Sequence, residues 1–528
     1  MVLLHDSPRS SRLHLDTMAA LMDQFTVHAL DTPGYGNSET LGTPQPSIAE
    51  LGLALGRTLA ALGLEQAPLY ATHTSSKIAL DHAANSAVPP PLLILDGLAI
   101  ASGPPDELFI AHYMRPFELD TGGAYLAAEW TRIRDGLRWF PWFETRPEFR
   151  LPTPVQTPEW IADFTLDLFS TGPSYPHAYA GAMRYDARPA LRSVASPVIV
   201  AAKSDDVLYI SLDQLPPDRS ATVSVERLSA DRGEWLAWLR ATLAQGAAPA
   251  GESSPPVATS GDGPAYVDLP HGQMLIHRRG EAAPGARPLL ILEAPTTLHA
   301  RLWQDAARGA TIVPELPGYG ESDPIDGGSL DDHARALVEM LGTIGVERVD
   351  VLGIGFAAPL VLALARNTPA MVGAIAFDGP ATGIATAAET LASLCPAVAF
   401  DLAGGHLHRL WHMLRDGEAH WPWFDQRVEA MRFIPPDYAP EGLHRTLVDI
   451  LKQPDHYGDA ALAGVRAGPL DPAGIGAPML FFDRTGDPAS RGVSDLAASA
   501  RYAEVIARPA ELAETAALLA EFLDQSAR

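Results

Sequence analysis

The sequence repeats itself at a constant interval, and this repeat constrains the fold more than any other feature. The segment DTPGYG at 31–36 returns as ELPGYG at 315–320. Trp130 and Trp411 stand 281 residues apart (411 − 130 = 281), and FPWF at 140–143 returns as WPWF at 421–424 with the same interval. Matched aromatic residues at a fixed interval are typical of a duplicated structural unit. The sequence therefore predicts two domains of one fold.

The stretch between the two halves has the composition of a linker. Residues 246–264 are rich in Pro, Gly, Ser and Ala and show no apolar periodicity. The chain of 528 residues also exceeds what one hydrophobic core serves, because single cores stop growing beyond about 250–300 residues. We expect one domain over 1–245, this linker, and a second domain over 265–528.

Strand and helix patterns alternate in each half. Short apolar runs at 2–4, 25–30, 68–72 and 198–202 are typical of buried strands, and 48–62 has apolar residues at helical spacing. The second half repeats this order but begins with an additional pair of runs, 266–269 and 274–277, which predicts a β-hairpin that the first half lacks. The alternation predicts an α/β fold in each half, a mostly parallel sheet with flanking helices.

Charge and cysteine content exclude several classes of function. The chain has a net charge of -26, with 64 Asp and Glu against 38 Lys and Arg, and no dense basic stretch. Nucleic acid and anionic membrane surfaces are therefore excluded as expected partners. Cys395 is the single cysteine, so no intrachain disulfide can form. With no signal peptide and no long apolar run, we expect a cytoplasmic protein without a membrane segment.

Several motifs resemble those of the α/β-hydrolase superfamily. HDSPRSS at 5–11 is similar to the oxyanion loop of that family, and DTPGYGNS at 31–38 to its following turn. THTSSKIAL at 72–80 is similar to the nucleophile elbow, and in the second half the elbow stands as GIGFA at 353–357, with Phe356 after Gly355. The resemblance implies two tandem α/β-hydrolase-type domains, each with a helical cap, at 101–190 and 383–470.

The resemblance also implies three catalytic positions, in the order nucleophile, acid and histidine. With the 281-residue interval, the nucleophile position holds Thr74 in the first half and Gly355 in the second (355 − 74 = 281). The acid is present twice, as Asp206 and Asp487 (487 − 206 = 281). No histidine occurs between 178 and 270 or after 456, so the expected general base is missing from both halves.

Arginines stand near the missing histidines. Arg227 and Arg508 keep the interval (508 − 227 = 281). A carboxylate that has lost its histidine needs another partner, and arginine offers a planar set of donors. We expect each arginine, or backbone N–H groups, to pair with the acid of its own half. An arginine that points into solvent at a strand end is the alternative.

Two readings of function remain. The first is a protein that binds a small apolar molecule and has lost ordinary Ser-His-Asp hydrolysis in both halves, serving binding, an active hydrolase paralogue, self-association or other chemistry. The second is an active hydrolase of a small ester that uses Thr74 with His5 or His73 as a displaced base. We expect no cofactor and no metal, and interpret His406, His408 and His412 as histidines of the cap.

Overall fold

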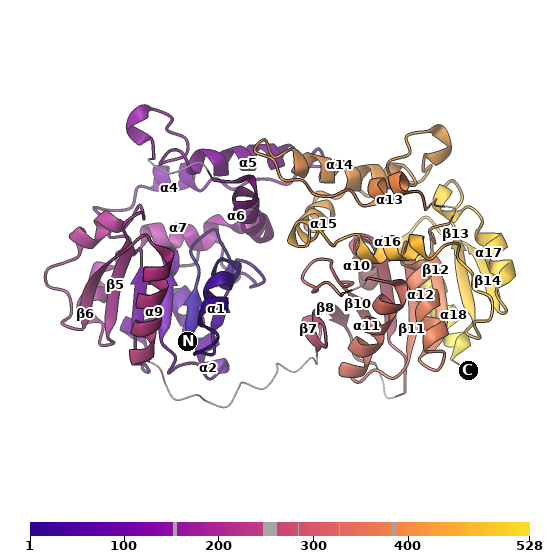
Figure 1. Ribbon diagram of the computed structural model, residues 1–528, viewed down its shortest axis with the longest axis horizontal. Helices are drawn as coiled ribbons and strands as arrows, with labels where there is room; N and C mark the ends of the chain where they lie inside the picture. The colour runs from indigo at the N-terminus through magenta and orange to yellow at the C-terminus, as the bar shows by residue number, and fades with distance from the viewer. Residues whose placement is uncertain are drawn as a thin grey trace. The chain divides into compact units, whose positions relative to one another are not determined.

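The computed structural model describes residues 1–151, 156–246, 261–282, 285–326, 328–382, 384 and 386–527 (Figure 1). The chain divides into two compact units, Met1–Glu118 with Ala128–Pro256, and Leu119–Ala127 with Val257–Arg528. Most of the predicted linker lies outside the described residues. Its last two residues, 263 and 264, belong to a strand, so the second unit begins slightly earlier than the sequence predicts.

The first unit contains a six-stranded sheet whose strands are all parallel. The sheet order is β2-β1-β3-β4-β5-β6. Strands β1, β3, β4 and β5 are mainly apolar without alternation because helices cover both faces, whereas the edge strand β6 is partly exposed. Their bounds are β1 Val2–Leu4, β2 His28–Leu30, β3 Leu69–Thr72, β4 Leu93–Asp96, β5 Val198–Lys203 and β6 Val223–Leu228.

Helices flank this sheet, and a helical insertion separates β4 from β5. Ser47 caps α2 with a capping box, in which its side chain and that of Glu50 exchange bonds with backbone N–H groups. The flanking helices are α1 Leu15–Leu21, α2 Ile48–Ala61, α3 Thr74–Asn85 and α9 Arg232–Gly246. The first insertion contains α4 Glu107–Tyr113, α5 Ala124–Gly136, α6 Pro158–Thr171, α7 Pro176–Arg184 and α8 Arg188–Ser193.

The second unit has an eight-stranded sheet in the order β14-β13-β12-β11-β9-β10-β8-β7. β7 and β8 form the predicted hairpin, and β10 also pairs antiparallel with β8. The remaining pairs are parallel. The bounds are β7 Gly263–Leu269, β8 Gly272–Arg279, β9 Leu289–Ala294, β10 Thr311–Pro314, β11 Val349–Gly355, β12 Val372–Asp378, β13 Met479–Asp483 and β14 Ala503–Ala507.

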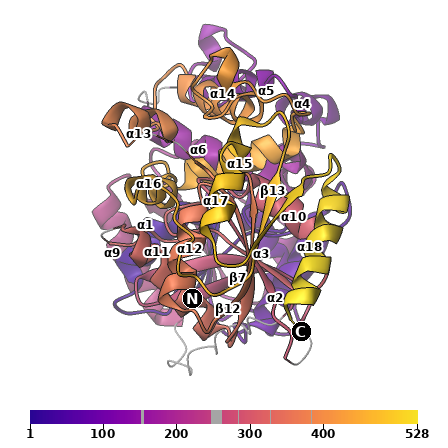
Figure 2. The same ribbon diagram turned by 90° about the vertical axis from the view of Figure 1, so that its right-hand side faces the viewer.

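Helices cover both faces of this sheet (Figure 2). An apolar core lies on each face. Helices α11 Leu330–Thr343, α12 Ala358–Asn367 and α17 Val493–Ser499 cover one face, and α10 Leu298–Ala306 and α18 Leu512–Ser526 cover the other. Trp303 of α10 is almost fully buried. The second insertion, between β12 and β13, contains α13 Ala388–Leu394, α14 Gly405–Ala419, α15 Pro440–Lys452 and α16 Asp459–Arg466.

The insertions of the two units share local details. Helices α5 and α14 begin 281 residues apart (405 − 124 = 281). An isolated antiparallel bridge joins Trp139 to Arg150, and its counterpart joins His420 to Met431 at the same interval (420 − 139 = 281; 431 − 150 = 281). The repeat in the sequence is thus accompanied by a repeat of local structure.

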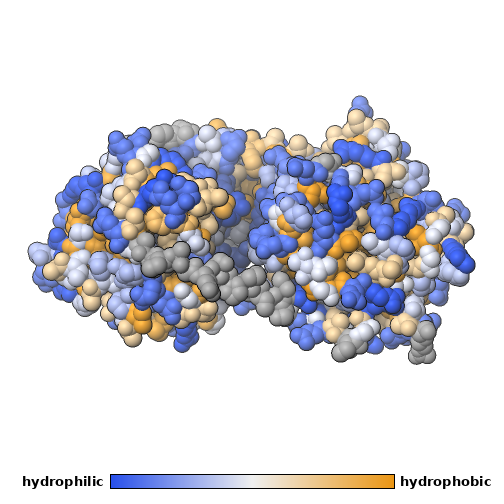
Figure 3. Space-filling model, turned by 60° about the horizontal axis from the view of Figure 1, so that its bottom comes forward, coloured by the Kyte–Doolittle hydropathy of each residue, from blue (hydrophilic) through white to orange (hydrophobic). Residues whose placement is uncertain are grey.

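The described surface mixes residue types. Figure 3 shows hydrophilic and hydrophobic residues interspersed over one face. Among the described residues, no helix is both long and apolar enough to cross a membrane.

Candidate functional site

The elbow of the second unit is the turn between β11 and α12. Gly355 ends β11 with a positive φ of 56°, a conformation that glycine adopts without a steric penalty. A Cβ at this position would meet no atom closer than 3.8 Å, so backbone conformation rather than crowding favours glycine here. The structure therefore places Gly355 at the elbow as predicted, and the position has no side chain that could act as a nucleophile.

In the first unit the strained elbow residue is His73, not Thr74. His73 has a φ of 43°, and it is the single non-glycine residue with positive φ in the described ranges. Thr74 is already the first residue of α3 and is buried. His73 is held in place by its backbone N–H, which donates to the Asp96 carbonyl at 2.9 Å. The position equivalent to Gly355 thus holds an imidazole.

Backbone conformation explains why the sequence comparison misplaced this position. His73 and Gly355 both have positive φ, and so do Gly97 and Gly379 after the next strand of each sheet (355 − 73 = 282; 379 − 97 = 282). Thr72 pairs with Asp96 in the first sheet, and Ile354 pairs with Asp378 in the second. Both residues differ from their counterparts by 282 (354 − 72 = 282; 378 − 96 = 282), whereas the interval is 281 from α5 onward. One residue is therefore gained or lost between β4 and α5, and the alignment of Thr74 with Gly355 was wrong by one position.

His73 is paired with the acid of its unit. Its Nε2 lies 2.8 Å from Oδ2 of Asp206, whose Oδ1 accepts the Leu208 backbone N–H at 2.7 Å. Burial alone would lower the pKa of His73, but the hydrogen bond and charge of Asp206 outweigh burial and raise it to about 9. The imidazole is therefore protonated at neutral pH and cannot accept a proton from Thr74.

The other candidate base, His5, is fully buried and uses both ring nitrogens. Nδ1 bonds the Asp6 carbonyl at 2.9 Å, and Nε2 accepts the Thr32 backbone N–H at 2.9 Å. This arrangement leaves neither nitrogen available to take a proton from Thr74.

The predicted pair of Asp206 with Arg227 is not formed. Arg227 pairs instead with Asp213 on the surface and lies over the ring of Tyr209 at 5.0 Å from its centroid. This arginine matches the solvent-facing alternative, because both members of its ion pair are exposed. The backbone partner expected for the acid is present, as the Leu208 N–H.

The acid of the second unit has an arginine partner that the sequence reading missed. Nη2 and Nε of Arg432, in the second insertion, lie 2.7 and 3.1 Å from the two carboxylate oxygens of Asp487. Asp487 also accepts the Ala489 N–H at 3.0 Å. The first unit has Leu151 at the position of Arg432 (432 − 151 = 281). The change from leucine in the first half to arginine at the matched position of the second half was the sequence feature that could have indicated this pair.

Arg508 pairs with a different carboxylate from the one predicted. Its Nε donates to Oδ1 of Asp378 at 2.8 Å, and the Trp303 indole donates to the other oxygen at 2.9 Å. Arg508 follows β14, whereas Asp378 ends β12, two strands away in the sheet. The predicted pair was wrong because Arg432, from the second insertion, already pairs with Asp487. The Arg508 side chain instead reaches across the ends of the strands to Asp378.

A histidine between two glutamates links the sheet to the second insertion. His299 of α10 contacts Glu293 through Nδ1 and Glu418 of α14 through Nε2, both at 2.9 Å. Burial acts to lower the pKa of His299, but the charges of Glu418 and Glu293 dominate and raise it well above its usual value. Burial acts in the opposite direction on Glu418, yet His299 and its other partners lower the pKa of Glu418 to about 2. The cluster therefore holds an imidazolium between two carboxylates.

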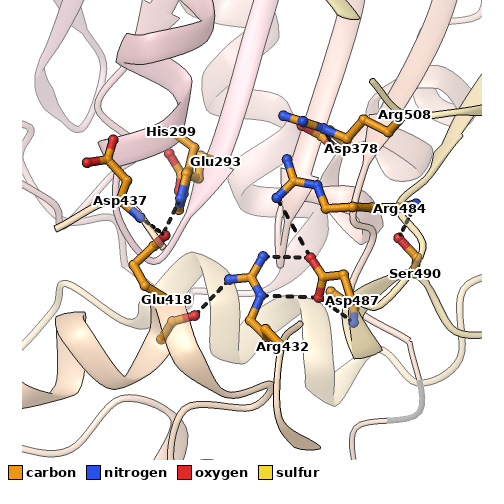
Figure 4. Close-up of polar contacts among 12 residues, drawn as sticks. Glu293, His299, Asp378, Glu418, Arg432, Asp437, Arg484, Asp487, Ser490 and Arg508 are labelled. Atoms are coloured by element: carbon orange, nitrogen blue, oxygen red, sulfur yellow. Dashed lines mark hydrogen bonds and ion pairs between the residues drawn. The ribbon is translucent and has the colours of Figure 1, made fainter. Parts of the chain in front are cut away.

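These polar groups form one wall of a cavity of about 660 Å³ in the second unit (Figure 4). The size is within the range of small-molecule sites. Phe356 and Trp421 stack over the elbow with ring centroids 4.9 Å apart and planes 27° apart. Other apolar side chains complete the wall, among them Leu302, Leu394, Met413, Leu414, Trp423, Phe433 and Ile434. Among the described residues, no His, Cys, Asp and Glu cluster fits a metal ion.

The order of the strands and the positions of the turns identify the fold. In the second unit, the elbow follows the fifth strand, the acid follows the seventh, and only the edge hairpin brings antiparallel pairing into the sheet. A strand-to-helix elbow at the carboxyl edge of such a sheet is the feature of α/β hydrolases. Both units have the α/β-hydrolase fold. The first unit lacks the hairpin and keeps the remaining six strands in the same order.

A curated enzyme and several solved structures are similar to parts of this chain. No family model matches. A 2-hydroxy-6-oxononadienedioate/2-hydroxy-6-oxononatrienedioate hydrolase 1 of Dechloromonas aromatica (strain RCB) is 32% identical over 80 residues, which span 15% of this chain and 28% of that enzyme.

Solved structures match about half of the chain. A thermophilic esterase from Thermogutta terrifontis is 15% identical, with 50% of this chain and 99% of that chain covered and a TM-score of 0.38. A hydrolase from Pseudomonas aeruginosa PA01 is 21% identical, with coverage of 49% and 96% and a TM-score of 0.36.

Proposed function

We propose that the second unit binds a small, mainly apolar molecule in its cavity, and that neither elbow carries out ordinary ester hydrolysis. One observation carries this proposal: Gly355 stands at the elbow directly beside an open cavity of about 660 Å³. Hydrolysis by this fold needs a hydroxyl or thiol nucleophile at the elbow and a base that activates it. Because Gly355 supplies no nucleophile at the elbow, the cavity beside it is suited to binding.

An active hydrolase built on Thr74 is the rival proposal for the first unit. Two features count against it. His73, at the strained position, has a pKa of about 9 and is therefore protonated at neutral pH, and both nitrogens of His5 are already bonded. A threonine hydroxyl without a base is a poor nucleophile.

We also infer that the two units arose by duplication and fusion of one α/β-hydrolase domain. The shared interval of α5 and α14 and of the two isolated bridges supports this inference. We propose an active hydrolase paralogue or a second copy of this chain as the partner of such a duplicated binding domain.

Simple esters should not be turned over. With the purified full chain, hydrolysis of p-nitrophenyl acetate and butyrate should stay at or near background, because a site without its base retains only about 10³–10⁴-fold over water. Thr74→Ala should leave the rate unchanged. The exposed helix residue Thr58 supplies the control Thr58→Ala. Ordinary enzymatic rates that disappear in Thr74→Ala but persist in Thr58→Ala would support the rival.

Binding should depend on the stacked rings beside Gly355. We expect Trp421→Ala to weaken the binding of an uncharged aromatic probe, 2-naphthamide, about tenfold, because a stacked aromatic contact and its buried area are both lost. Isothermal titration calorimetry measures the change. Phe140 occupies the matched position in the first unit (421 − 140 = 281) and is half exposed, so Phe140→Ala should leave binding unchanged. Equal affinities of wild type and Trp421→Ala would contradict this placement of the ligand.

A further inference from the structure

Seven charged side chains of the cavity lining form close ion pairs with one another. Asp378 pairs with Arg508, Asp487 with Arg432, and the two glutamates share His299. Asp437 and Asp483 also line the cavity and form no ion pair with any of the described residues. Arg484, in the loop after β13, lines the same cavity without such a close partner. Its guanidinium makes no hydrogen bond within the described part of the chain, and its nearest carboxylate oxygen, Oδ2 of Asp487, lies 3.9 Å away.

The two carboxylates near Arg484 are each held more closely by another arginine. Figure 4 shows the Arg484 guanidinium between the pair of Asp378 with Arg508 and the carboxylate of Asp487. The two carboxylates attract it, but each is already matched by an arginine, and these arginines repel it. Burial lowers the pKa of Arg484, as expected for a cation removed from water. An arginine stays protonated under these conditions, so Arg484 presents a cationic guanidinium with unused hydrogen-bond donors to the cavity.

The loop holds Arg484 in place without using its guanidinium. The backbone N–H of Arg484 donates to the Ser490 hydroxyl at 3.0 Å, and the Asp483 carbonyl accepts the Arg508 N–H at 2.8 Å. The donors of the side chain therefore remain available on a fixed backbone. The first unit differs, because its counterpart Lys203 (484 − 281 = 203) lies over the Trp235 ring at 5.0 Å from its centroid.

We infer that the ligand of the second unit is a small organic anion, an aromatic or otherwise apolar body with a carboxylate that Arg484 binds. This inference rests on the proposed binding function of the same cavity. The planar donors of a guanidinium match two carboxylate oxygens, and a carboxylate ligand would supply the hydrogen-bond acceptors that the Arg484 side chain lacks. Phe356 and Trp421 would hold the apolar body, since they stack on each other within the same lining.

Two probes of equal size separate the charge from the apolar body. 2-Naphthoate and its uncharged analogue 2-naphthamide are titrated into the full chain by calorimetry. We expect wild type to bind the naphthoate about 10-fold to 100-fold more tightly, as hydrogen bonds to a charged group provide. Arg484→Gln should abolish this preference while leaving the affinity for naphthamide within about twofold. Arg484→Lys, which keeps the charge but not the planar fork, should retain part of the preference.

Lys203→Gln provides the matched control in the first unit and should leave both affinities unchanged. A wild-type chain that binds both probes equally, or an Arg484→Gln variant that keeps the full preference, would overturn the assignment of Arg484 but not the binding function. Failure of both probes to bind, up to their solubility limits, would overturn the binding function together with this inference.

Discussion

Replacing Arg508 by alanine is expected to destabilise the second unit by about 3–5 kcal/mol, because the change leaves the Asp378 carboxylate buried without its ionic partner. The two side chains are only 7% and 10% exposed, and the Nε to Oδ1 distance is 2.8 Å. The same substitution at Arg227 should change stability by less than about 0.5 kcal/mol, since that arginine pairs with an exposed aspartate. Urea unfolding followed by circular dichroism measures both.

The origin of the loss can be tested with a second change. Asp378→Asn in the Arg508→Ala background removes the unpaired charge, so the double variant should recover part of the stability. In the wild type, burial acts to raise the pKa of Asp378, but the charge of Arg508 and the other partners of this carboxylate hold that pKa below its usual value. Equal, small effects of Arg508→Ala and Arg227→Ala would show that the ion pair contributes nothing and would contradict the prediction.

Removing the imidazolium of His299 is expected to cost about 1–3 kcal/mol at pH 6, because two hydrogen bonds to charged groups are lost and two glutamates then face each other. The estimate lies below that for Arg508 because the His299 side chain is 36% exposed. His299→Gln keeps a polar side chain of similar length. Unfolding of this variant and of wild type at pH 6 measures the difference.

The same variant should change how stability depends on pH. The folded-state pKa of His299 is raised above its unfolded value, so its contribution is complete below about pH 6.5 and is lost as pH rises through the folded pKa. Glu418 has the opposite sign: its lowered pKa makes its contribution complete above about pH 4.5 and lost as pH falls toward 2. Wild type should therefore lose stability above pH 6.5 through this cluster.

His299→Gln should lack that loss, because it has no titrating ring. The matched control is His456→Gln, which removes an exposed histidine paired with Asp459 on the surface of the second unit. This control should follow the pH dependence of wild type. Parallel stability curves for wild type and His299→Gln between pH 6.5 and 9 would contradict the assignment of a raised pKa.

The sequence was sufficient for the class of fold and for the organisation of each sheet. Apolar runs separated by amphipathic segments predict a mostly parallel sheet, because a strand covered by helices on both faces needs no polar side. The β7–β8 hairpin was predicted from Pro270-His271-Gly272 between two short runs, and the turn is local enough to be visible in a sequence. Gly355 at the elbow was likewise predicted, since a strained turn favours glycine.

Two features of the site could not be predicted from the sequence and became visible only in the tertiary structure. The elbow of the first unit was misplaced by one residue, because only the backbone conformation, a positive φ at both positions, shows that His73 and Gly355 are equivalent. The partners of the acids were also hidden: Arg432 comes from an insertion 55 residues before Asp487, and Arg508 reaches a carboxylate 130 residues away. A sequence indicates that a buried charge needs a partner, but not which one reaches it.

The sequence by itself predicted two α/β domains, and it showed that no histidine stands at the usual position of the base in either half. Tertiary structure alone decided that His73 occupies the elbow beside Asp206, that Arg508 pairs with Asp378, and that Arg484 lines the cavity with its nearest carboxylate oxygen 3.9 Å away. The physical reason is the separation along the chain of the residues that interact. Strand and helix periodicity is written in neighbouring residues, whereas ion pairs form between groups that only the packed sheet and its insertion bring within a few ångströms.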